Sequence, residues 1–174
     1  MNWNRVWIIG NGPSRLTFDC DRLENENVIV LNSGLLRYSL YSASAFFSLD
    51  RKFITRYVRA IENFKGEKHL ALPSPRPVIN GTVWYDWSHK DGLSEIPGVL
   101  CTGCNSGYAA LGLCYTHMTK EIHLVGYDMD PKDNDQYQFW AKSFRTMIPQ
   151  LDARGIKVWN HNPNSFIDAF PKIS

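Results

Sequence analysis

Short apolar runs recur along this chain, and most are followed by a polar residue or a glycine. They cover residues 5–9, 28–31, 45–49, 69–72, 121–125 and 156–159. Runs of four or five apolar residues are too short for helices and are typical of strands buried on both faces. The chain is therefore expected to form a sheet whose two faces are both covered.

Segments with helical periodicity separate several of these runs. Apolar residues recur at three- and four-residue spacing over 53–61, 108–118 and 137–151. Pro149 lies inside the last segment and predicts a kink or an early end there. The alternation of strand and helix indicates an α/β domain with a mostly parallel sheet and helices on both faces.

The length of 174 residues suits one domain over 1–174, and 44% hydrophobic residues with 21% charged is a globular composition. The formal net charge of +2 gives no reason to expect binding to nucleic acid or to an acidic membrane surface. No stretch has the roughly 20 apolar residues of a membrane span, and the first residues lack the apolar run of a signal peptide. We therefore expect a cytoplasmic protein, with a homo-oligomer left open.

Cys101 and Cys104 form a C-x-x-C pair near the start of an expected helix. A structural zinc site usually needs four ligands, and this chain has no second pair. We expect no metal at these cysteines and interpret them as small residues at a helix entrance in a reducing compartment.

Polar residues and glycines follow several of the expected strands, among them Gly10, Asn32, Asp50, and Gly126 with Asp128 two residues later. In a parallel sheet, ligands bind outside the carboxyl ends of the strands. We expect these residues to meet at one crevice. The irregular stretches 73–103 and 127–136 are candidates for lid loops over it.

The most informative segment is the loop Gly10-Asn11-Gly12-Pro13-Ser14, which follows the first strand. Glycines let the backbone approach a phosphate or sugar, and the amides of such a turn point at anionic oxygens. The loop lacks the G-x-G-x-x-G spacing of a dinucleotide site and the lysine of a phosphate-binding P-loop. It predicts a nucleotide-type ligand, with a plain tight turn as the alternative.

Two further groups complete the candidate site. Asn105, Ser106 and Gly107 open an expected helix, so their amides could bind an anion or simply allow close packing. Asp128 and Asp130 follow a strand and could bind a sugar hydroxyl, act as a general base, or cap a turn. His161, which follows the last strand, is the one histidine considered for chemistry.

In chain order these motifs resemble the bacterial lipooligosaccharide sialyltransferases and the broader motility-accessory-factor-like and hydroxymethylpterin-pyrophosphokinase-like proteins. The similarity extends over both ends and the late middle of the chain and rests on the segments 6–14, 19–23, 30–32, 105–128 and 159–165. It implies a Rossmann-like domain that requires no metal or other cofactor and binds a CMP-sugar or another nucleotide. By this matching Asn11, Asn32, Ser106 and Gly107 contact the ligand, and Tyr137 faces its phosphate.

One departure from the family pattern bears on activity. The sialyltransferases carry a histidine general base between the late strand and the C-terminal strand, and residues 124–160 contain no histidine here. Three hypotheses follow. The first is a minimal nucleotide-sugar-dependent glycosyltransferase with a glycan or other hydroxyl acceptor, in which Asp128, Asp130 or His161 deprotonates the acceptor. The second is a Mg²⁺-dependent pyrophosphokinase that uses Asp50, Asp128 and Asp130. The third is a non-catalytic nucleotide-binding module.

Overall fold

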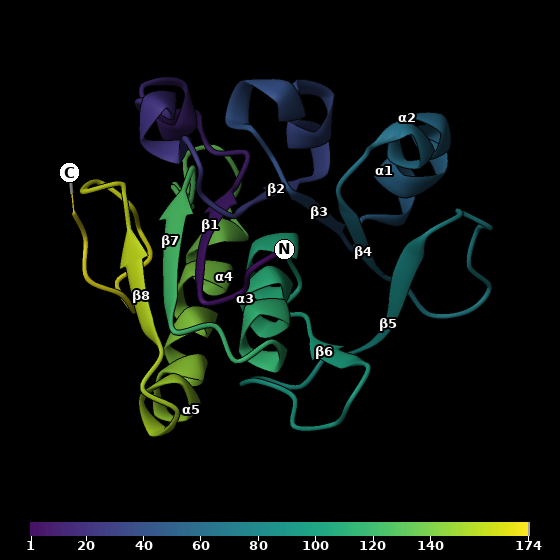
Figure 1. Cartoon of the computed structure of the whole chain (residues 1–174). Coiled ribbons are helices and arrows are strands. Elements are labelled where there is room, and N and C mark those ends of the chain that lie inside the picture. Colours follow the sequence, from purple (N-terminus) through teal and green to yellow (C-terminus); the bar gives the residue numbers. More distant parts are fainter. Residues whose placement is uncertain (174) are drawn as a thin grey trace.

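A computed structural model describes residues 1–173, apart from the side chain of Tyr38. Within it, eight strands form one parallel sheet (Figure 1) in the order β6-β5-β4-β3-β2-β1-β7-β8. The strands are β1 (Arg5–Ile9), β2 (Val28–Leu31), β3 (Ala45–Ser48), β4 (Glu67–Ala71), β5 (Thr82–Ser88), β6 (Val99–Cys101), β7 (Glu121–Val125) and β8 (Lys157–Asn160). The predicted α/β fold with a parallel sheet is confirmed.

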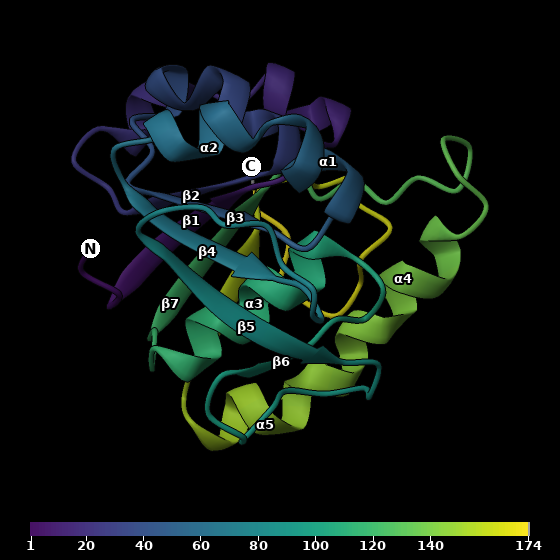
Figure 2. The same cartoon turned by 90° about the vertical axis from the view of Figure 1, so that its right-hand side faces the viewer.

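Helices cover both faces of the sheet, as Figure 2 shows. One layer consists of α1 (Arg51–Arg56) and α2 (Val58–Asn63), with the 3₁₀ segments η1 (Pro13–Leu16), η2 (Cys20–Leu23) and η3 (Asn32–Tyr41). The other consists of α3 (Ser106–Thr116), α4 (Tyr137–Ser143), η4 (Phe144–Met147) and α5 (Ile148–Ala153). None of the helices formed by residues 1–173 has the length and apolar character that a membrane span requires.

Each strand of the central sheet supplies both layers of the core, because successive side chains point to opposite faces. In β1, Val6 and Ile8 pack on the side of α3, while Trp7 and Ile9 pack on the opposite side. This explains why the strand sequences are apolar throughout instead of alternating.

Helix α3 is apolar on all sides because it lies inside the core. Its residues from Ser106 to Tyr115 are all buried. This helix also makes the return crossing from β6, at one edge of the sheet, to β7, which pairs with β1. The chain thus leaves β1 on one side toward β2 and returns on the other side as β7. The carboxyl ends of β1 and β7 form a topological switch point, where open α/β sheets bind their ligands.

The expected lid loop over 73–103 is not a loop, because this stretch contains β5 and β6, which extend the sheet beyond β4. Near the sheet edge, strands need not be buried on both faces. In β5 only Tyr85 is buried, so the strand lacks a continuous apolar run. By contrast, 127–136 is irregular, and its function as a lid stays a prediction.

The two long helical patterns are interrupted in the structure. The segment over 53–61 is divided at Tyr57, whose φ of −115° departs from helical geometry. The segment over 137–151 is divided into α4, η4 and α5, and Pro149 lies in the first turn of α5. Proline is tolerated at that position because the first amides of a helix have no partner in the helix.

Candidate functional site

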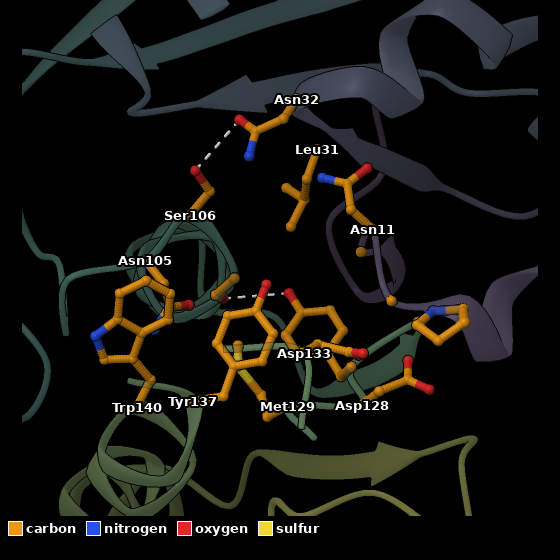
Figure 3. A pocket seen from close by; sticks show the side chains of 16 residues that line it. Asn11, Leu31, Asn32, Asn105, Ser106, Asp128, Met129, Asp133, Tyr137 and Trp140 are labelled. Carbon is orange, nitrogen blue, oxygen red and sulfur yellow. Dashed lines mark hydrogen bonds between the residues drawn. The ribbon is translucent and has the colours of Figure 1, made fainter. Parts of the chain in front are cut away.

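A cavity of about 250 Å³ lies at the switch point (Figure 3). Ten of the predicted site residues line it: Gly10, Asn11, Gly12, Pro13, Asn32, Asn105, Ser106, Gly107, Asp128 and Tyr137. Six further residues complete the wall: Leu31, Gly126, Tyr127, Met129, Asp133 and Trp140. The predicted convergence of strand-end loops on one crevice therefore holds for β1, β2 and β7.

The loop after β1 is held against the loop after β7 by backbone hydrogen bonds. The Gly10 amide donates to the Val125 carbonyl over 2.7 Å, and the Gly12 amide donates to the Gly126 carbonyl over 2.9 Å. Gly12 has φ −63°, which any residue can adopt. Glycine is required there by space, since a Cβ atom would lie 1.9 Å from Asp128 Oδ2 and 2.7 Å from the Gly126 oxygen.

Asp128 fastens three separate segments together. Its Oδ1 accepts hydrogen bonds from the Ser14 amide at 3.1 Å and from Asn162 Nδ2 at 3.0 Å. Its Oδ2 accepts one from the Ser14 hydroxyl at 2.8 Å. Three donors on two different segments fix the position of this carboxylate. The geometry therefore gives Asp128, predicted as a candidate base, a positioning role for the glycine loop.

Two asparagine side chains present amide donors to the cavity. Asn32 Oδ1 accepts from the Ser48 hydroxyl at 2.7 Å and from the Ser106 hydroxyl at 3.3 Å. Asn11 Oδ1 accepts from the Ser33 hydroxyl at 2.8 Å. With both oxygens engaged, the Nδ2 groups of Asn32 and Asn11 are directed toward the interior, as Figure 3 shows.

The N-terminus of α3 forms the wall beside Asn32. The Asn105 side chain caps the helix by accepting the Tyr108 amide at 2.7 Å. This leaves the amides of Ser106 and Gly107, which belong to the first helical turn and have no partner within the helix. A Cβ atom on Gly107 would lie 2.9 Å from the Tyr127 ring. Close packing therefore occurs at this helix start, and anion binding by the two amides stays a prediction.

Aromatic side chains from α4 form the opposite wall. Tyr137 and Trp140 are both partly buried, with ring centroids 5.5 Å apart. Figure 3 shows the Tyr137 hydroxyl directed toward the cavity. Tyr127, by contrast, is structural: its hydroxyl donates to the Gly107 carbonyl at 3.2 Å, and burial raises its pKa well above the usual value.

Four predicted residues lie outside this cavity. Asp50 caps α1 by accepting the Phe53 amide at 3.1 Å, because an aspartate between a strand and a helix can satisfy a free helical amide. Ser14, Asp130 and His161 line a second cavity on the other side of Asp128. Two of the carboxylates named for Mg²⁺, Asp50 and Asp128, are thus occupied as hydrogen-bond acceptors.

The structure gives no metal geometry among its described residues. Within 1–173, no three His, Cys, Asp or Glu side chains are grouped closely enough to hold an ion. Cys101 is buried and Cys104 is exposed, and both thiols are free. Burial raises the pKa of Cys101, which favours the unreactive thiol form.

Comparison of the chain with protein-family models, curated proteins and solved structures gives no match. The resemblance to the sialyltransferase group therefore rests on the motifs alone. The geometry of the cavity carries the functional argument.

Proposed function

We propose that the cavity binds a nucleotide and that the protein is a glycosyltransferase, which transfers a sugar from a nucleotide-linked donor. One observation carries the proposal. Asn11 and Asn32 direct their Nδ2 groups into a single cavity at the switch point, and Ser106 and Gly107, whose amides have no partner within α3, line the same cavity together with the rings of Tyr137 and Trp140. Donors of this kind suit the sugar and phosphate oxygens, and a ring such as Trp140 suits stacking on a planar base.

The charges around the cavity disfavour a ligand with several phosphates. Among the residues described in its wall there is no lysine or arginine, and the charged ones are Asp128 and Asp133. A triphosphate normally needs lysine and Mg²⁺ to balance its charge. One phosphate diester can be bound by neutral amides at a helix N-terminus. The volume of about 250 Å³, near the lower end for small-molecule sites, also supports a nucleoside monophosphate in preference to ATP.

Calorimetric titration with CMP, UMP, GMP and ATP tests this proposal. We expect one nucleoside monophosphate to bind in preference to ATP, without added metal. Ser106→Ala removes one hydroxyl from the cavity and one hydrogen bond to Asn32, which costs roughly 0.5–1.5 kcal/mol. The affinity of the Ser106→Ala variant for the preferred nucleotide should fall about tenfold or less.

Thr116→Ala is the matched control, because it removes a hydroxyl from the opposite end of the same helix, where it bonds the Leu113 carbonyl at 2.8 Å. It should leave the affinity unchanged. A wild-type protein that binds none of the four nucleotides would contradict the proposal. So would equal losses of affinity in the two variants.

A further inference from the structure

A second cavity adjoins the first, and three residues line both: Pro13, Asp128 and Asp133. Its volume is about 770 Å³. The remaining walls come from the η1–η2 region, including Phe18 and Arg22, and from the turn that begins at His161. Nothing in the proposed nucleotide site accounts for it.

A chain of three side chains leads from the start of β7 to this cavity. Glu121 Oε1 lies 3.1 Å from His123 Nε2, and His123 Nδ1 lies 2.9 Å from His161 Nε2. His123 stacks on Trp7, with ring centroids 4.2 Å apart and planes inclined by 15°. The chain joins residues 38 positions apart because β7 and β8 are adjacent and parallel.

The hydrogen bonds determine where each proton lies. A carboxylate only accepts, so Glu121 requires a proton on His123 Nε2. A neutral His123 then has its lone pair on Nδ1. This atom therefore accepts a hydrogen bond from the N–H group at His161 Nε2. Consequently a neutral His161 has its free lone pair on Nδ1.

The surroundings of His161 keep it neutral and leave that lone pair unused. Burial, then His123, then Arg22 lower the pKa of His161 to about 4. Its Nδ1 is shielded and has no hydrogen-bond partner within the described part of the chain. A buried acceptor without a donor is unfavourable. His161 lines the second cavity, so a ligand O–H or N–H group would satisfy Nδ1 once the side chains that shield this atom move aside.

The charge of the second cavity selects among such ligands. In the part of its wall that the structure describes, the carboxylates of Asp19, Asp128, Asp130 and Asp133 face one cationic side chain, that of Arg22. Unlike the first cavity, this one has no residue of the α3 N-terminus among its described wall residues to offset the carboxylates. It therefore disfavours an anionic ligand, whereas a neutral or positively charged one is compatible with the wall.

We propose that this second cavity binds the acceptor substrate, a neutral or positively charged molecule bearing hydroxyl and amino groups such as an amino sugar, with His161 Nδ1 accepting a hydrogen bond from it. This proposal rests on the proposed function, because a molecule in the second cavity can accept a group only if the first cavity holds the donor. The two cavities adjoin at Asp128 and Asp133. The Glu121–His123–His161 chain orients the imidazole for this contact.

The histidine chain can be tested without any ligand by long-range ¹H–¹⁵N correlation of the imidazole nitrogens. We expect His161 to be neutral at pH 7, with its proton on Nε2. Glu121→Gln should preserve this tautomer, because its side-chain oxygen still accepts from His123. Glu121→Ala should give a mixture of tautomers. A wild-type His161 protonated on Nδ1 would overturn the assignment.

Titration with galactosamine and glucuronate tests the ligand class. Galactosamine should shift the His161 Nδ1 resonance and bind at least tenfold more tightly than glucuronate. His161→Phe should reduce its affinity at least tenfold and leave nucleotide affinity unchanged. His117→Phe is the control, because His117 is stacked on Trp3 and lines neither cavity. It should leave the affinities for galactosamine and for the nucleotide unchanged.

The outcomes separate this proposal from the previous one. If galactosamine shifts His161 but no nucleotide binds, the second site stands and the nucleotide proposal fails. If a nucleotide binds but galactosamine leaves His161 unshifted, or glucuronate binds equally well, the second-site proposal fails.

Discussion

Replacing Gly12 with valine should abolish nucleotide binding and destabilise the fold by about 3 kcal/mol, the scale of severe overpacking. The valine Cβ would lie 1.9 Å from Asp128 Oδ2 and 2.7 Å from the Gly126 carbonyl oxygen. The carbonyl belongs to the backbone and cannot rotate away. The glycine loop must therefore separate from the loop after β7, and the cavity wall is lost with it. Urea unfolding and nucleotide titration measure the two effects.

Two further variants make the interpretation specific. Gly112→Ala adds a methyl group in α3, where its nearest neighbours lie at an ordinary 3.8–3.9 Å. It should be neutral or stabilise by up to about 1 kcal/mol, since alanine is the better helix former. Adding Asp128→Ala to Gly12→Val should recover only part of the lost stability, because the Gly126 contact remains. A Gly12→Val protein with wild-type stability and nucleotide affinity would show that the loop is an ordinary turn.

Asp128→Ala should lower the free energy of unfolding by about 2–4 kcal/mol. The change leaves the Ser14 amide, the Ser14 hydroxyl and Asn162 Nδ2 without their acceptor. Hydrogen bonds to charged groups are worth about 1.5–3 kcal/mol each, and their losses at one carboxylate are not additive. Denaturant unfolding at pH 7 is the measurement.

Asp128→Asn is the matched comparison, since its oxygen can still accept from the Ser14 amide and Asn162 while its Nδ2 donates to the Ser14 hydroxyl. Asp128→Asn should therefore lose less than half as much stability as Asp128→Ala. Equal destabilisation by the two substitutions would show that the negative charge, and not the hydrogen-bond geometry, stabilises the loop.

The central strands could be predicted because a strand buried on both faces has a continuous run of apolar residues. Residues 5–9, 28–31 and 121–125 are apolar over most of their length, and they are β1, β2 and β7. Near the sheet edge this apolar run is absent, because in β5 the residues around the buried Tyr85 are exposed or only partly buried. Pro73, Pro75 and Pro77 precede β5 and give the stretch 73–103 an irregular character in the sequence, although all three lie outside the strand.

The candidate site could be predicted as far as it depends on strand ends. Asn32 and Gly10 follow their strands directly, and both line the cavity. Asp50 follows β3 in a similar way but caps α1, and the two uses of a polar residue after a strand look alike in a sequence. The pairing of His123 with His161 depends on which strands are neighbours, information that no local pattern contains. Trp140 could have been found from its three-residue spacing to Tyr137, which places both rings on one side of α4.

Backbone and side-chain NMR of the ¹⁵N-labelled protein, titrated with the nucleotide that binds best, tests the central claim most directly. We predict that the amides of Gly12, Ser106 and Gly107 shift together with the Asn32 carboxamide and the Trp140 indole. The amides of Gly98 and Gly155 should not shift, because neither glycine lines the cavity and both lie in open surroundings, where an added Cβ would meet nothing within 4 Å. Shifts confined to residues outside the cavity, or none at saturating nucleotide, would contradict the account.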